Sequence, residues 1–176
     1  LMPIDAQKGD SLPVSVFTGR GGGTFPPGTS KYEKRSIADR VPSWQSSKCI
    51  QCNQCAFVCP HAAIRPFLLD EKETRNAPKV FETIPAIGKG MESYSFKIQV
   101  SVQDCTGCGN CMNVCPAKEK ALVFEPIDQQ KHEIDNWNYA VTLSKKNIPL
   151  SFQTVKGSQF STPLLEFSGA CAGCGE

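Results

Sequence analysis

Apolar and polar residues alternate strictly through residues 96–102, where the apolar positions are Phe96, Ile98, Val100 and Val102. A period of two residues is typical of a half-buried strand, and this strand would deliver the chain to Cys105. A short apolar run at 121–124 predicts another strand that returns beside the first. Between these two strands we expect a short helical segment after Pro116.

An earlier stretch of the chain follows the same order, with apolar residues at 62–64 after a loop that ends in Pro60. Strand, loop, short helix and strand, repeated twice within residues 44–125, predict an α+β fold of the ferredoxin type. Residues 66–95 exceed what a compact repeat needs and are therefore interpreted as an insertion. The charged run 70–75 within it predicts an exposed turn of helix.

The flanking segments have a different composition. Residues 1–43 are rich in Gly, Pro, Ser and Thr, which is typical of irregular structure and linkers. Within them, 14–17 predicts a short strand and 32–38 the start of a short helix. Residues 126–163 are interpreted as a connecting segment pinned by the aromatic side chains of Trp137 and Tyr139.

Composition excludes two classes of partner. The 176 residues are 40% hydrophobic with a formal net charge of +2, and the sequence shows no clustered stripe of Lys and Arg. Nothing therefore supports nucleic-acid binding. No apolar run approaches the length needed to span a bilayer, so we expect no integral membrane segment.

Two copies of one cysteine pattern carry the chemistry. Each copy has the spacing C-x2-C-x2-C-x3-C-P, first from Cys49 to Pro60 and then from Cys105 to Pro116. This spacing is typical of proteins that carry two 4Fe-4S clusters, in which the fourth cysteine of each run binds the neighbouring cluster. The ligand sets should therefore cross over. We expect Cys49, Cys52, Cys55 and Cys115 at the first cluster, and Cys59, Cys105, Cys108 and Cys111 at the second.

Zinc and disulfides are the alternatives. A structural zinc site usually has two C-x-x-C pairs a dozen or more residues apart, which this spacing does not match. The ten cysteines make an even count, but the chain starts with no secretory signal and is long enough to form a core without crosslinks. Reduced thiols and iron-sulfur chemistry indicate an intracellular, low-oxygen setting.

The residues around the cysteines predict how the clusters are tuned. Gly107 and Gly109 allow close approach of the backbone, so that N–H groups can point at sulfurs. His61 and His132 have no recognisable catalytic partner nearby in the sequence, so no catalytic residue is expected. Apolar residues should keep water away from both clusters: Ile50, Phe57, Val58, Met112 and Val114.

The whole chain resembles pyruvate:ferredoxin (flavodoxin) oxidoreductase. Residues 32–35, Tyr-Glu-Lys-Arg, resemble the EKR region of that family and make 1–43 an EKR-type linker region. The two cysteine runs follow, and residues 164–176, with Cys171 and Cys174, resemble the opening of its thiamine diphosphate domain. A generic ferredoxin would share the cysteine runs but not these flanking segments. The chain is therefore expected to be a piece of a longer polypeptide.

The resemblance implies a homodimeric enzyme that converts pyruvate, coenzyme A and oxidised ferredoxin or flavodoxin into acetyl-CoA, carbon dioxide and the reduced acceptor. It implies thiamine diphosphate with Mg and three 4Fe-4S clusters in the full-length enzyme. Cys171 and Cys174 would be two ligands of the third cluster, nearest thiamine. The chain would be the electron-relay section, without catalytic activity alone, in the cytoplasm or in a hydrogenosome or similar anaerobic organelle.

Three other interpretations remain open. A fusion that passes electrons onward to a flavin and NADP would need a reductase domain farther along the polypeptide. A stand-alone ferredoxin-like carrier would be a native product that ends near Glu176. A zinc-binding interaction module would be colourless and would contain no acid-labile sulfide.

Overall fold

A computed structural model describes residues 2–22, 34 and 36–161. The chain divides into two compact units, Leu1–Arg35 and Ser36–Glu176. The first unit contains α1 (Met2–Asp5) and 3₁₀ helices at Gly9–Ser11 and Val14–Phe17.

The short strand predicted at 14–17 is wrong, because Val14–Phe17 is a 3₁₀ helix. Pro13 precedes it with φ −69°, and the N–H of Val16 donates to the Pro13 carbonyl at 3.0 Å. The tight turn satisfies its own backbone groups, as short 3₁₀ helices do. The helix expected at 32–38 is also absent where the structure describes it, at Lys34 and Ser36–Ala38. The other residues of that prediction, 32, 33 and 35, lie outside the described residues.

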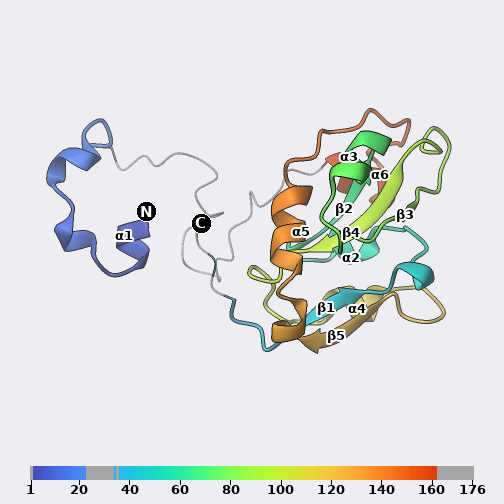
Figure 1. The fold of residues 1–176 in the computed structure, drawn as a ribbon, viewed down its shortest axis with the longest axis horizontal. Coiled ribbons are helices and arrows are strands. Elements are labelled where there is room, and N and C mark those ends of the chain that lie inside the picture. Colours follow the sequence, from blue (N-terminus) through green and yellow to red (C-terminus); the bar gives the residue numbers. More distant parts are fainter. Residues whose placement is uncertain (1, 23–33, 35, 162–176) are drawn as a thin grey trace. The chain divides into compact units, whose positions relative to one another are not determined.

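The second unit is built on two antiparallel sheets (Figure 1). β1 (Arg40–Trp44) pairs with β5 (Leu122–Pro126), with Pro42 opposite Phe124. The other sheet has the order β2-β4-β3, from β2 (Ile64–Leu69), β4 (Ser95–Val100) and β3 (Ile84–Pro85). Thus each copy of the repeat lends one strand to each of these sheets.

The strand prediction at 121–124 is confirmed, but its expected partner is wrong. β5 pairs with β1 of the first copy, and β4 pairs with β2 of the first copy. Within one copy, the cysteine loop and a helix separate the two strands in sequence, and the two strands enter different sheets. Pairing between copies brings the two cysteine loops together instead.

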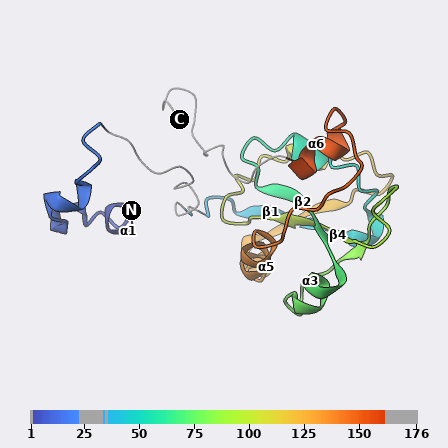
Figure 2. The same ribbon diagram turned by 90° about the horizontal axis from the view of Figure 1, so that it is seen from above.

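Short helices flank these sheets. α2 (Gln54–Phe57) and α4 (Asn110–Val114) follow the two cysteine loops. α3 (Glu71–Asn76) and α5 (Glu133–Ala140) lie on one side of the sheets, and α6 (Val155–Ser161) lies on the other (Figure 2). Further 3₁₀ helices occur at Ser46–Lys48 and Ile127–Gln130.

The charged helical turn at 70–75 is confirmed as α3. Asp70 caps it: its carboxylate accepts from the Glu73 N–H at 2.8 Å, and the Glu73 side chain accepts from the Asp70 N–H at 2.9 Å. This reciprocal capping box satisfies two otherwise unpaired donors. The short helix expected after Pro116 is wrong, because 117–119 form bends and no helix follows them before β5. The Lys120 ammonium donates to the Cys115 carbonyl at 2.7 Å. This hydrogen bond satisfies a carbonyl at the C-terminal end of α4, where the helix stops.

The strand at 96–102 is confirmed as β4, but it is buried on both faces and not half-buried. Phe96 and Ile98 belong to the main core, while Lys97 and Gln99 on the other face expose 3% and 0% of their surface. α5 packs over that second face, where the Gln99 amide donates to the Glu133 carboxylate at 2.5 Å. A helix from the connecting segment therefore covers polar side chains that the alternation assigned to water.

Candidate functional site

A first hollow is lined by four cysteines from both copies of the repeat. Its empty volume is about 330 Å³, including space open to solvent. Strands β1, β4 and β5 supply most of its apolar wall. The cysteines are Cys49, Cys52, Cys55 and Cys115, and the wall includes Trp44, Ile98, Ala121 and Leu122.

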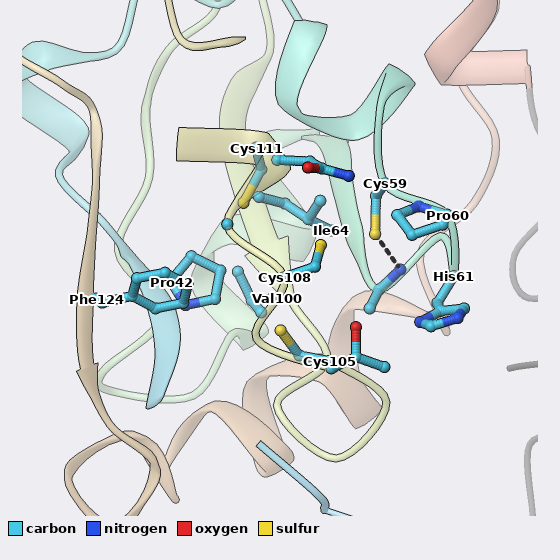
Figure 3. Close-up of a pocket in the computed structure, with 14 residues that line it drawn as sticks. Pro42, Cys59, Pro60, His61, Ile64, Val100, Cys105, Cys108, Cys111 and Phe124 are labelled. Atoms are coloured by element: carbon cyan, nitrogen blue, oxygen red, sulfur yellow. Dashed lines mark hydrogen bonds between the residues drawn. The ribbon is translucent and has the colours of Figure 1, made fainter. Parts of the chain in front are cut away.

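A second hollow has the reciprocal composition, with one cysteine from the first run and three from the second. Its empty volume is about 390 Å³ by the same measure. Figure 3 shows the sulfurs around the hollow, with Pro42 and Phe124 on the side away from Cys59. Its cysteines are Cys59, Cys105, Cys108 and Cys111. The structure thus brings together the same two sets of four that the crossed spacing predicts.

The two cysteine loops share a left-handed backbone conformation, but glycine marks it in the sequence of the second loop only. Gly107 and Gly109 have φ of 70° and 80°, in the left-handed region that favours glycine. At the corresponding positions of the first loop, Gln51 and Asn53 have φ of 57° and 62°. The first loop therefore accepts left-handed residues that carry side chains.

Those side chains have distant partners and are almost fully buried, each exposing 1% of its surface. The Gln51 amide donates to the Pro85 carbonyl at 2.7 Å and accepts from the Ile87 N–H at 2.8 Å. The Asn53 amide donates to the carbonyl of Lys156 at 3.0 Å. The sequence analysis missed both residues. Their signal was the exchange of glycine for an amide side chain between the two copies.

Backbone N–H groups point at cysteine sulfurs, as expected from Gly107. The N–H groups of Gln51 and Gly107 lie 3.4 Å from the sulfurs of Cys49 and Cys105, respectively. The N–H of Ala63 lies 3.3 Å from the sulfur of Cys59 (Figure 3). Such donors stabilise charge on a sulfur and are one way in which a protein tunes a bound cluster.

The pKa values of several cysteine thiols in these hollows are raised. Burial, followed by the neighbouring thiolates, raises the pKa of Cys111 to about 12 and that of Cys55 well above its usual range. Burial likewise raises the pKa of Cys105 to about 11, although the Gly107 N–H opposes it. Four thiolates could share either hollow only with a strong positive charge among them, which iron supplies.

Two cations interact electrostatically with these cysteines. Arg65 on β2 is buried and donates to the Gln159 carbonyl at 2.6 Å; burial lowers its pKa, and the charge of Cys59 opposes that shift. Lys156 on α6 is half-buried, and burial lowers its pKa against the charges of Cys52 and Cys49. Both cations are linked to α6, a helix that the sequence analysis placed in the connecting segment and did not predict.

The expected apolar cover is partly wrong. Ile50 and Phe57 expose 54% and 59% of their surface, although Ile50 still borders the first hollow. Val58, Met112 and Val114 are half-buried. Both hollows owe most of their cover to strand residues. A residue adjacent to a ligand in sequence lies on a loop, and its side chain can point outward while the sheet beneath supplies the wall.

The hollows differ from a site for one metal ion. Among residues 2–22, 34 and 36–161, no three His, Cys, Asp or Glu side chains converge closely enough to hold a single ion. Zinc ligands meet at one atom, whereas each thiolate of a 4Fe-4S cluster binds a different iron at the corner of a cube. Each hollow has four cysteine sulfurs and an apolar wall, which suits a 4Fe-4S cluster better than a single zinc ion. His61 borders the second hollow, whereas Cys171 and Cys174 lie outside the described residues.

Two family models match the chain. A 4Fe-4S dicluster domain matches residues 48–119, which include both cysteine runs. The EKR family, a domain of unknown function, matches residues 1–38.

Similar proteins match over the full length of the chain. It is 58% identical to a pyruvate-flavodoxin oxidoreductase of Enterobacter agglomerans and 57% identical to the pyruvate:ferredoxin oxidoreductase of Moorella thermoacetica, and covers 15% of each. It is 51% identical to a pyruvate dehydrogenase [NADP(+)] of Cryptosporidium parvum, of which it covers 9%. None of the helices described here combines the length and apolar character needed to cross a membrane. Along its whole length, this chain is homologous to a segment of the pyruvate:ferredoxin and pyruvate-flavodoxin oxidoreductases, and it carries a 4Fe-4S dicluster domain.

Proposed function

We propose that the two hollows hold two 4Fe-4S clusters with crossed ligand sets. Cys49, Cys52, Cys55 and Cys115 would hold one cluster, and Cys59, Cys105, Cys108 and Cys111 the other. The observation that carries the proposal is the lining of each hollow by three cysteines of one run and the fourth cysteine of the other. When bound, each cluster would accept and release one electron at a time.

The protein's own contribution is to hold the sulfurs, exclude water and tune charge. Antiparallel pairing of β1 with β5 and of β2 with β4 keeps the two hollows in one folded unit. The strand residues form apolar walls, while the N–H groups of Gln51, Ala63 and Gly107 point at sulfurs. Both features act on the reduction potential of a cluster. The arrangement suits electron transfer between neighbouring centres.

At the level of the whole protein, we propose an electron-relay section of a pyruvate:ferredoxin or pyruvate-flavodoxin oxidoreductase. That enzyme would convert pyruvate, coenzyme A and the oxidised acceptor into acetyl-CoA, carbon dioxide and the reduced acceptor. Other domains of a longer homodimeric polypeptide would supply thiamine diphosphate with Mg. The names of the similar proteins and identity along the full chain support this proposal.

The domain plan belongs to the same proposal. Residues 1–43 would be the EKR-type region, 44–125 the two-cluster domain, 126–163 the connection, and 164–176 the start of the thiamine diphosphate domain. Cys171 and Cys174 would bind part of a third cluster. The matches at 1–38 and 48–119 support the order of the first two parts.

The test is a reciprocal pair of substitutions, Cys59→Ser and Cys115→Ser, in the native cluster-loaded protein. Cys59→Ser should alter the EPR signal of the second cluster, and Cys115→Ser that of the first. Iron content should fall by at most about four atoms per chain in each variant. Each variant should also lose pyruvate-dependent reduction of ferredoxin or flavodoxin. The uncrossed result, with Cys59→Ser altering the first cluster, contradicts the ligand sets.

A second candidate function is a fusion that delivers the electrons to NADP. Pyruvate dehydrogenases [NADP(+)] of Cryptosporidium parvum and Euglena gracilis are 51% and 47% identical to this chain. Pyruvate-dependent reduction of NADP by the purified polypeptide, without added ferredoxin or flavodoxin, would select this candidate. Reduction of the protein acceptors only would select the first. A native product without either activity would be a stand-alone carrier.

A further inference from the structure

Lys156 reaches the first cysteine loop from a remote part of the chain. It lies on α6, 103 residues after Asn53, and its carbonyl accepts the amide of Asn53 at 3.0 Å. Asn53 directly follows Cys52, so this bond joins the backbone of α6 to the cysteine loop. α6 also packs against α2, which begins at the next residue.

The ammonium group of Lys156 is held by the inserted segment, which is itself bonded to the first cysteine loop. Its Nζ donates to the carbonyl of Ile87 at 2.5 Å. The N–H of Ile87 in turn donates to the Gln51 side chain at 2.8 Å. Both ends of Lys156 are therefore fixed through buried amide side chains that flank Cys52. Such a double attachment limits how far the charge can move from the sulfurs.

The residue after Lys156, Gly157, packs against the turn that leads into α6. A Cβ atom at this position would overlap the carbonyl oxygen of Ser151. Gly157 is buried, and its N–H donates to the Thr154 hydroxyl at 3.1 Å. The start of α6 is therefore tightly packed beside Lys156.

The electrostatic setting of this ammonium is asymmetric. Burial lowers the pKa of Lys156, and the anionic groups opposing that shift among the described residues are the thiolates of Cys52 and Cys49. Both cysteines belong to the first hollow. In the second hollow, the charge of Cys59 likewise opposes the lowering of the Arg65 pKa by burial.

We propose that Lys156 tunes the first 4Fe-4S cluster, stabilising its reduced state and raising its reduction potential relative to a chain without this charge. The proposal rests on the ligand sets proposed above. Reduction adds one negative charge to the cluster, and a fixed cation in a partly desolvated position favours the more negative state. Lys156 would thus help to determine the direction of electron flow between the two centres, without touching the reacting substrate.

The experiment is an EPR-monitored redox titration of the native, cluster-loaded protein and its Lys156→Met variant. At a fixed potential near the midpoint, the variant should have a threefold to tenfold lower ratio of reduced to oxidised first cluster. A tenfold change in this ratio corresponds to about 59 mV for a one-electron couple. The signal of the first cluster is identified as the one altered by Cys115→Ser.

Lys156→Arg keeps the charge and should retain most of the original midpoint. Lys156→Gln removes the charge and should repeat the shift of Lys156→Met. If the methionine variant loads its clusters poorly, the comparison of Lys156→Arg with Lys156→Gln decides the outcome. The matched control is Lys72→Met, which removes an exposed lysine on α3, on the other side of the sheets from α6 (Figure 2). This control should leave both midpoints unchanged.

The outcomes separate this inference from the function on which it rests. If Lys156→Met and Lys156→Gln both keep their iron and the midpoint potential of the first cluster is unchanged, the role of Lys156 is overturned. The proposed clusters are then unaffected. Equal shifts of both midpoints overturn a local effect of charge. An original protein without any 4Fe-4S signal overturns the proposed function itself.

Discussion

Gln51 and Gly107 occupy equivalent positions in the two cysteine loops and adopt the same left-handed backbone, with φ of 57° and 70°. Each donates its N–H to the sulfur of the cysteine two residues earlier, at 3.4 Å. Only Gln51 adds a side chain, which binds residues 85 and 87 on a distant segment. The two loops therefore share one backbone conformation and one N–H contact to sulfur. The Gln51 side chain additionally anchors the first loop to the inserted segment.

We expect Gly107→Ala to destabilise the second loop by about 2 kcal/mol or more, because the left-handed conformation strains a side chain. The new Cβ would also lie 3.2 Å from the Arg40 carbonyl. Gly109→Ala is the matched control: its φ is 80°, but its nearest contact would be an ordinary 3.6 Å to Phe124. It should cost about 1 kcal/mol. Chemical unfolding and iron content measure both effects, and equal costs would contradict a role for the Arg40 contact.

Substituting Gln51→Leu should free the segment around Ile87. The change leaves the Pro85 carbonyl and the Ile87 N–H without the partners they have in the structure. Because Pro85 and Ile87 are exposed residues, each lost hydrogen bond should cost about 0.5–1.5 kcal/mol. Hydrogen exchange at the Ile87 amide should accelerate at least tenfold. Protection that equals that of the original protein would show that the amide anchor contributes nothing to this segment.

Glu73→Gln should destabilise the second unit by about 2 kcal/mol at pH 7. Burial alone would raise the pKa of Glu73, but the Lys146 ammonium at 2.6 Å and the donors of Asp70 and Ser144 hold it below its usual value. This stabilisation is present above the unfolded pKa of about 4.3 and is lost as pH falls through the lower folded pKa.

The difference between original and Glu73→Gln proteins should therefore stay nearly constant from pH 7 to about pH 5 and shrink as pH falls below about 4.3. The control on the same helix is Glu71→Gln, which removes an exposed pair with Arg75. An exposed i,i+4 pair contributes about 0.5 kcal/mol or less. A Glu73 effect independent of pH would assign it to packing.

Anaerobic removal of iron should destabilise both halves of the repeat together. Cys111 is part of the main core, and Cys49, Cys55 and Cys59 pack against it. The empty hollows would be lined by neutral thiols, and crossed ligands would release both loops at once. The melting temperature should fall by more than about 10 °C. Calorimetry before and after chelation checks this, and reconstitution with iron and sulfide should restore the original value.

The spacing of the cysteines is a local property, and it was sufficient to predict which four belong together. A run of thiols at intervals of three can be brought around one hollow by a single loop, whatever the rest of the chain does. Gly107 was equally predictable, because a residue without Cβ marks a left-handed position with close backbone contacts. α3 was predicted from its run of charges, whereas its cap was seen only in the structure.

The tertiary structure alone decided what surrounds those sulfurs. The pairing of β5 with β1, the hydrogen bond of Gln99 to Glu133 on α5 and that of Asn53 to the Lys156 carbonyl all join segments far apart in the sequence. Alternation of apolar and polar residues predicts which residues share a face of a strand. It does not predict which distant element covers that face. The sequence by itself thus predicted which cysteines line each hollow and the class of cofactor proposed for them. The fold determined the charges and donors around them, because electrostatic energy depends on distance in space and not on separation along the chain.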